Sequence, residues 1–126
     1  MPYRFIIEAV EGVRMRKRLI PRKKIRAKFL LTYELEGCQT AVNFLTEYYG
    51  IRRMKIVLDG RRVGNGDEAC YDNCKAYFTK RGLNKRNVLH ELYHHIVEAY
   101  ELEMSERIEE GLANRYARKV MKKAKT

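Results

Sequence analysis

The residues of this chain that are best suited to chemistry lie in one short segment, His90-Glu91-Leu92-Tyr93-His94. In a helix, histidines four residues apart lie on the same face, so both imidazoles can reach a single metal ion. Glu91 is offset by about 100° around the helix, which places it beside that ion. There its carboxylate can take a proton from metal-bound water and return it to a leaving amine. This HExxH pattern predicts a catalytic Zn²⁺ with His90 and His94 as ligands and Glu91 as general base.

A catalytic zinc usually takes three protein ligands, and this sequence has few sources for the third. The only other histidine is His95, which lies about 140° around the helix from the first ligand and cannot share the ion. No aspartate follows Asp72, so a ligand from the last predicted helix has to be a glutamate. Glu110, at the edge of that helix's apolar face, is the main candidate and Glu109 is its rival. Asn114, one turn further on, can orient a ligand histidine or the carboxylate.

Several other groups have roles that the sequence leaves open. The transition-state oxyanion needs a donor besides zinc, and the chemically able side chains are Tyr71, Tyr77, Tyr93, His95 and Tyr116. Cys38, in Glu36-Gly37-Cys38, is an alternative third ligand of the kind used by peptide deformylases. The glycine-rich glutamine motif of that family is absent, which disfavours this alternative. Cys70 and Cys74 would share one face of a strand, where packed thiols are a more ordinary interpretation than a structural zinc site.

These groups need a scaffold, and hydrophobic periodicity predicts an α+β domain. Period-two alternation predicts basic N-terminal strands within residues 1–36, at 3–9, 13–19 and 25–35, and further strands at 54–58 and 69–79. Capping residues and helical periodicity predict helices over about 40–50, 84–100 and 105–121. The expected architecture is a mainly antiparallel sheet packed against the HExxH helix and the C-terminal helix.

Length, charge and cysteine content narrow the class of protein. The chain has 126 residues, which predicts one domain over 1–126 with a frayed tail at 122–126. Apolar runs are too short for a membrane span, and an odd number of cysteines predicts reduced thiols and a cytoplasmic location. The net charge is +11, with the basic excess in residues 1–28 and 111–126. That excess supports an alternative function, a basic nucleic-acid-binding or regulatory protein with a non-catalytic metal site, although solvated strand faces explain much of it.

Two motifs together resemble the signature of a known family. His90-Glu91-Leu92-Tyr93-His94, followed by Glu110-Gly111-Leu112-Ala113-Asn114-Arg115-Tyr116-Ala117, is similar to the HExxH … ExxAN.[FY]A pattern of the ImmA/IrrE-like zinc metallopeptidases, within the gluzincins. The resemblance covers about residues 40–121. The chain departs from the family in a short spacing between the motifs and in predicted N-terminal strands where members often begin with a helix.

The resemblance implies a zincin-like fold and a zinc-dependent peptidase. It implies His90, His94 and Glu110 as ligands, Glu91 as general base, and a protein or peptide substrate. In zincins generally, an extended substrate pairs with an edge strand above the metal helix, and residues 69–78 are the candidate strand here.

Overall fold

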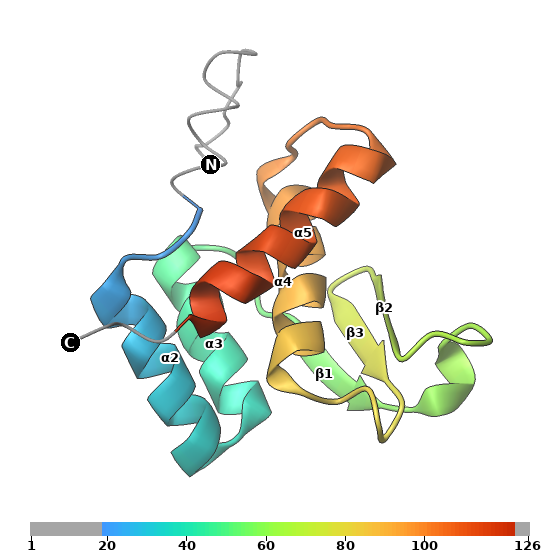
Figure 1. Ribbon diagram of the computed structural model, residues 1–126, viewed down its shortest axis with the longest axis horizontal. Helices are drawn as coiled ribbons and strands as arrows, with labels where there is room; N and C mark the ends of the chain where they lie inside the picture. The colour runs from blue at the N-terminus through green and yellow to red at the C-terminus, as the bar shows by residue number, and fades with distance from the viewer. Residues whose placement is uncertain (1–18, 123–126) are drawn as a thin grey trace.

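A computed structural model describes residues 19–122 of the chain (Figure 1). Two helices come first, α2 (Lys23–Glu36) and α3 (Cys38–Tyr49), followed by β1 (Lys55–Leu58) and a short 3-10 turn, η1 (Gly60–Arg62). Strands β2 (Ala69–Asp72) and β3 (Lys75–Phe78) and helices α4 (Lys85–Tyr100) and α5 (Glu106–Met121) complete the described part. The fold is therefore α+β. In Figure 1 the α2–α3 pair lies on one side of α4 and the sheet lies on the other.

The strand predicted at 25–35 is wrong, because this segment forms helix α2. Phe29 is fully buried, and Ile25 and Tyr33, each four residues away, pack against the same core. Leu31 and Leu35, which the strand prediction placed on the buried face, are 59% and 73% exposed. Lysine, arginine, leucine, alanine and glutamate dominate the segment, and all of them favour helices. The strands predicted at 3–9 and 13–19 lie outside the described residues, except for Leu19, which is in a turn.

The sheet is mixed, which corrects the prediction of a mainly antiparallel one. Its strand order is β1-β3-β2, with β1 parallel to β3 and β2 antiparallel to β3. The single strand predicted at 69–79 is a hairpin, because Asn73 and Cys74 adopt left-handed φ angles of 47° and 65°. Two consecutive residues of this conformation form the tight turn that reverses an antiparallel pair. The hairpin leaves β2 at one edge of the sheet.

The helices that carry the candidate site begin where their capping residues predict. Asn84 accepts a hydrogen bond from the Asn87 amide at 2.9 Å at the start of α4, and Ser105 accepts one from the Ile108 amide at 3.2 Å at the start of α5. These bonds satisfy amide groups that have no partner within the helix. The two helices pack on each other through a shared core, formed by Val88, Leu89, Leu92, Ile96, Ala113, Tyr116, Ala117 and Val120.

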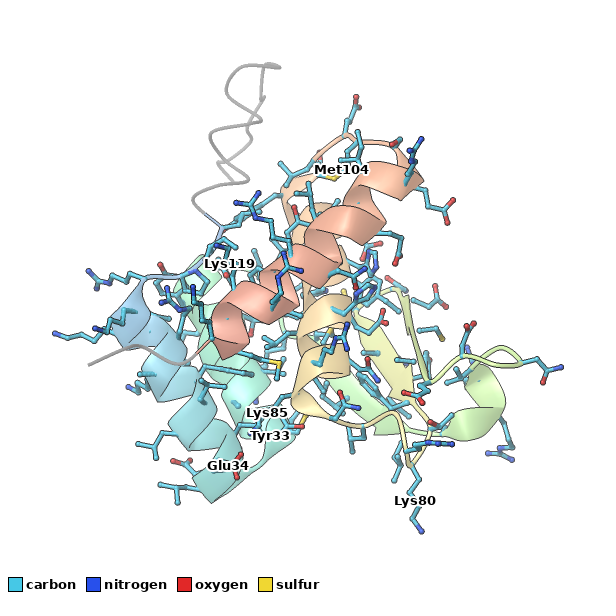
Figure 2. The ribbon with its side chains drawn as sticks, in the orientation of Figure 1. Tyr33, Glu34, Lys80, Lys85, Met104 and Lys119 are labelled. Atoms are coloured by element: carbon cyan, nitrogen blue, oxygen red, sulfur yellow. The ribbon has the colours of Figure 1, made fainter. Side chains whose placement is uncertain are left out.

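Contacts at the start of α4 fix its position against α2 on one side and against the start of β2 on the other. Lys85 forms an ion pair with Glu34 and lies 5.6 Å from the centre of the Tyr33 ring (Figure 2). On the other side, a Cβ atom added to Gly82 would lie 2.0 Å from the carbonyl oxygen of Glu68. Only glycine allows this close approach, so the chain leading into α4 lies directly against the start of β2. Within residues 19–122, every helix is too short or too polar to span a bilayer.

Candidate metal centre and cleft

Three side chains from α4 and α5 converge on one point. The Nε2 atoms of His90 and His94 are 3.3 Å apart. The two carboxylate oxygens of Glu110 lie 3.0 Å from His90 Nε2 and 2.9 Å from His94 Nε2. Ligand atoms about 2.0–2.1 Å from one tetrahedral zinc ion are about 3.3 Å from each other. The spacing of these three donors therefore suits a zinc ion.

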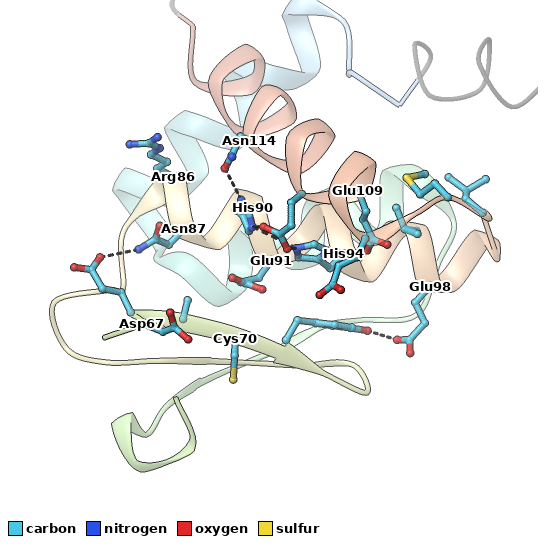
Figure 3. Close-up of a pocket in the computed structure, with 18 of the residues that line it drawn as sticks. Asp67, Cys70, Arg86, Asn87, His90, Glu91, His94, Glu98, Glu109 and Asn114 are labelled. Atoms are coloured by element: carbon cyan, nitrogen blue, oxygen red, sulfur yellow. Dashed lines mark hydrogen bonds and ion pairs between the residues drawn. The ribbon is translucent and has the colours of Figure 1, made fainter. Parts of the chain in front are cut away.

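The other nitrogen of each histidine is held by a residue of α5 (Figure 3). His90 Nδ1 lies 2.8 Å from Asn114 Oδ1, and His94 Nδ1 lies 2.6 Å from Glu109 Oε2. A carboxylate and an amide oxygen can only accept, so both Nδ1 atoms donate, and an imidazole that donates from Nδ1 offers its Nε2 lone pair when the ring is neutral. Burial lowers the pKa of His90, which favours its neutral form. Two imidazole nitrogens and a carboxylate facing one another could hold a metal ion, and this donor set is one that fits zinc.

Glu91 lies beside the three converging residues with its carboxylate largely withdrawn from water. It is 7% exposed and lines the same cleft. No residue within 19–122 forms a hydrogen bond or ion pair with it. Burial raises its pKa to about 7, against the opposing influence of His94. A carboxyl group in this state can both take and give a proton near neutral pH.

The candidate centre opens into a cleft of about 1020 Å³ between β2 and the helices α4 and α5. The cleft is strongly acidic, because eight carboxylates and one guanidinium line it: Asp67, Glu68, Glu91, Glu98, Glu101, Glu106, Glu109, Glu110 and Arg86. Figure 3 shows β2 running along one side, with Asp67 and Glu98 near opposite ends. The basic character of the whole chain is therefore reversed at this site.

Tyr71 is the candidate oxyanion donor that the structure places at the cleft. Its hydroxyl is 2.8 Å from His95 Nδ1, forms a hydrogen bond with Glu98, and accepts one from the Cys74 amide at 2.9 Å. His95 Nε2 is 2.7 Å from the Arg52 carbonyl oxygen, to which it donates. His95 therefore fastens α4 to the chain before β1 and does not face the metal centre. Cys74, His95 and Glu98 form a second group close enough to hold a metal, and the Tyr71 hydroxyl forms hydrogen bonds with all three residues.

The other candidate donors lie away from the cleft. Tyr93 and Tyr116 are 2% and 1% exposed and belong to the core, where the Tyr116 hydroxyl is 2.7 Å from that of Tyr49. These two tyrosines, which the sequence offered as oxyanion donors, therefore lie in the core and do not line the cleft. Tyr77 is also buried, and its ring packs under Arg62.

The cysteine alternatives find no support in the geometry. Cys38 begins α3, where it contacts Tyr33, and it does not line the cleft. Cys70 lies on β2 and its thiol donates to the Arg62 carbonyl at 3.3 Å, whereas Cys74 lies in the hairpin turn. The two thiols therefore do not share the strand face that their spacing predicted.

Sequence reasoning missed two features of the site. Glu109 was weighed only as a rival ligand, yet it contacts the far nitrogen of His94. The pairing of Glu98 with Tyr71 was also missed. Glu98 follows His94 by four residues, so helical spacing alone places both on one face and could have suggested that Glu98 belongs to the site.

Comparisons with protein-family models, with curated proteins and with solved structures find no match for this chain. Functional inference therefore rests on the residues and their geometry.

Proposed function

We propose that this protein is a zinc-dependent metallopeptidase of the gluzincin type with a zincin-like fold. The observation that carries the proposal is the convergence of His90, His94 and Glu110 beside a buried carboxylate, Glu91, that no described residue pairs with. The ImmA/IrrE-like sequence pattern supports it. Helix α2 replaces one of the predicted N-terminal strands that departed from that pattern, in which members often begin with a helix.

Each residue then has a defined task in hydrolysis. Zinc, when bound, supplies a Lewis acid that activates water and polarises the peptide carbonyl. Glu91 accepts the proton of the attacking water and passes it to the leaving amine, and its pKa of about 7 suits both transfers. Asn114 and Glu109 hold the two imidazoles with their Nε2 atoms toward the centre. The single proton of the Tyr71 hydroxyl already serves Glu98, so Tyr71 becomes a donor to a developing oxyanion on the β2 side only when a substrate displaces that contact.

The edge of β2 offers a place for an extended peptide to bind. The Thr79 amide donates to the Glu68 carbonyl at 3.0 Å, which sets the alternation of the β2–β3 ladder. By that alternation, the amide and carbonyl groups of Ala69 and Tyr71 face away from β3, and both residues line the cleft. A substrate can add to this edge through main-chain hydrogen bonds that do not depend on its sequence.

The acidic cleft argues against the alternative function at this site. Phosphate groups are repelled by clustered carboxylates, so a nucleic acid would have to bind elsewhere on the molecule. Structural zinc sites are normally closed by four protein ligands. Here three donors face a cleft, which is the arrangement of a catalytic centre.

The substitution Glu91→Gln tests the proposal. We expect wild type and this variant each to bind one zinc ion, measured by elemental analysis after removal of excess metal. Hydrolysis of casein or of a quenched fluorescent peptide should fall about 10²–10⁴-fold in the variant, because the general base is lost. Glu47→Gln, an exposed change on α3, is the control. Undiminished cleavage by Glu91→Gln, or a wild type that binds no zinc, would refute the proposal.

A further inference from the structure

One end of the cleft combines an apolar floor with an acidic rim. Val97, Leu102 and Met104 line this end, and the first two are buried. Glu98, Glu101 and Glu106 line it as well, and all three are exposed. None of these glutamates forms an ion pair with a residue in the described part of the chain. Their charge is therefore available to a ligand.

The fold adds to the negative potential at this place. Helix α4 ends at Tyr100, with Glu101 as its left-handed C-cap. The C-terminus of a helix carries a partial negative charge that favours cations. A cleft lined by one sign of charge also concentrates the field and attracts ligands of the opposite sign. The opposite end of the cleft is less negative, because Arg86 lies there and offsets one of the two carboxylates, Asp67 and Glu68, at that end.

We propose that this end of the cleft is a subsite for a lysine or arginine side chain of an extended peptide, so that the substrates are cationic. The proposal rests on the peptidase function proposed above. The methylene stem of such a side chain would lie on Val97, Leu102 and Met104, and its charged head would reach the three glutamates. A neutral polar side chain would leave the rim uncompensated, and an acidic one would be repelled.

The subsite is close enough to the metal centre to select the residues around the cleaved bond. Glu98 is four residues beyond His94, which is about 6 Å along the helix axis. That distance corresponds to about two residues of an extended peptide. Glu98 is also held in place by the Tyr71 hydroxyl on β2, the edge along which the peptide would run. A basic residue about two positions from the scissile bond is therefore expected.

Peptide binding tests the subsite separately from catalysis. Three dye-labelled ten-residue peptides, identical except for a central Lys-Lys, Gln-Gln or Glu-Glu pair, are titrated into the zinc-loaded full chain carrying Glu91→Gln, and anisotropy is followed. We expect the lysine peptide to bind at least about tenfold more tightly than the glutamine peptide in low salt, and the difference to shrink as salt rises. The glutamate peptide should bind most weakly.

Matched variants then show which glutamates cause the preference for the lysine peptide. Adding Glu98→Gln, Glu101→Gln and Glu106→Gln together should abolish it. Adding Glu36→Gln, Glu47→Gln and Glu103→Gln changes the net charge equally at exposed residues outside the cleft and should leave it intact.

The outcomes separate the two proposals. Equal or undetectable binding of the lysine and glutamine peptides, or a preference that survives the triple change in the cleft, would overturn the subsite. A preference that the triple change abolishes would establish it. If wild type then hydrolysed none of the peptides, the subsite would stand and the peptidase function would fall.

Discussion

Glu109 and Glu110 are neighbours in the chain, yet they contact opposite sides of the same imidazole. Glu110 lies 2.9 Å from His94 Nε2, and Glu109 lies 2.6 Å from His94 Nδ1. One carboxylate therefore faces the proposed metal position, and the other contacts the far nitrogen of the ring and so holds its orientation. The two residues should differ in what their removal does.

Glu110→Ala and Glu109→Ala form a matched pair for zinc affinity. Loss of an outer partner such as Glu109 typically weakens metal binding about 10–100-fold. Loss of Glu110 removes a direct ligand, so we expect a larger decrease, measured by competition with a chromogenic chelator. A larger effect from Glu109→Ala would transfer the ligand role to Glu109.

In the metal-free protein, the protonation of Glu91 should make the free energy of unfolding depend on pH. Burial raises its pKa from an ordinary 4.5 to about 7, so folding favours the protonated form. The associated stability is complete below pH 4.5 and is lost as the pH rises through 7. Glu91→Gln removes this loss. From pH 4.5 to pH 8, the difference in unfolding free energy between the variant and wild type should therefore shift by roughly 1–3 kcal/mol in favour of the variant. Urea unfolding with a chelator at both pH values measures the gain, and a pH-independent difference would contradict it.

Spacing in the sequence was sufficient to predict the relative positions of some residues of the site and insufficient for others. His90, Glu91 and His94 lie within five residues of one helix, so their relative positions follow from helix geometry. The choice between Glu110 and Glu109 depends on how α5 is rotated against α4, and one residue of rotation is about 100°. Local sequence does not fix that rotation, because packing of the whole α4–α5 pair determines it.

The helices and strands around the site were predictable where strong local signals in the sequence mark their ends. Asn84 and Ser105 are capping residues, and they start α4 and α5 as expected. Helix α2 was misread because its apolar residues satisfy a period of two as well as a helical one. The turn at Asn73 and Cys74 lacks the glycine that usually marks a hairpin, so one long strand was predicted where two short ones exist.

Gly82 and Gly111 give opposite predictions for the same substitution. A Cβ on Gly82 would lie 2.0 Å from the Glu68 carbonyl oxygen, whereas one on Gly111 would meet nothing within 4 Å. Gly82→Ala must displace the start of β2, and we expect a loss of about 1–3 kcal/mol. Gly111→Ala, inside α5, should add up to about 1 kcal/mol through helix propensity. Chemical denaturation measures both, and a harmless Gly82→Ala would contradict the close contact.

At the scale of the whole molecule, a bound zinc ion would link helix α4 to helix α5. The proposed ligands come from α4 and α5, so they converge only when the chain is folded. A metal that binds only the folded chain stabilises it by about 2.7 kcal/mol when the free metal concentration is 100 times the dissociation constant. We expect zinc to raise the melting temperature of wild type and a chelator to reverse the change, as followed by circular dichroism. Glu110→Ala should show a much smaller shift. An equal shift in that variant would mean that zinc binds elsewhere.

Charge is also distributed by the fold in a way that composition could not show. The net charge of +11 suggested an acidic partner, but the cleft at the candidate centre is lined by eight carboxylates and one guanidinium. These carboxylates come from the segment before β2, from the two last helices and from the connection between them, so only the folded chain brings them together.

The connection between α4 and α5 joins the two halves of the proposed metal centre. Residues 101–105 link the helix that bears both histidines to the helix that bears Glu109, Glu110 and Asn114. Two of these residues are anchored, since Leu102 packs in the core and Ser105 caps α5. A residue inserted between them is therefore expected to bulge outward near Glu103, which is exposed, and to leave the packing that fixes the rotation of α5 in place. The centre should thus tolerate a longer chain between its two halves better than a change in the packing between them.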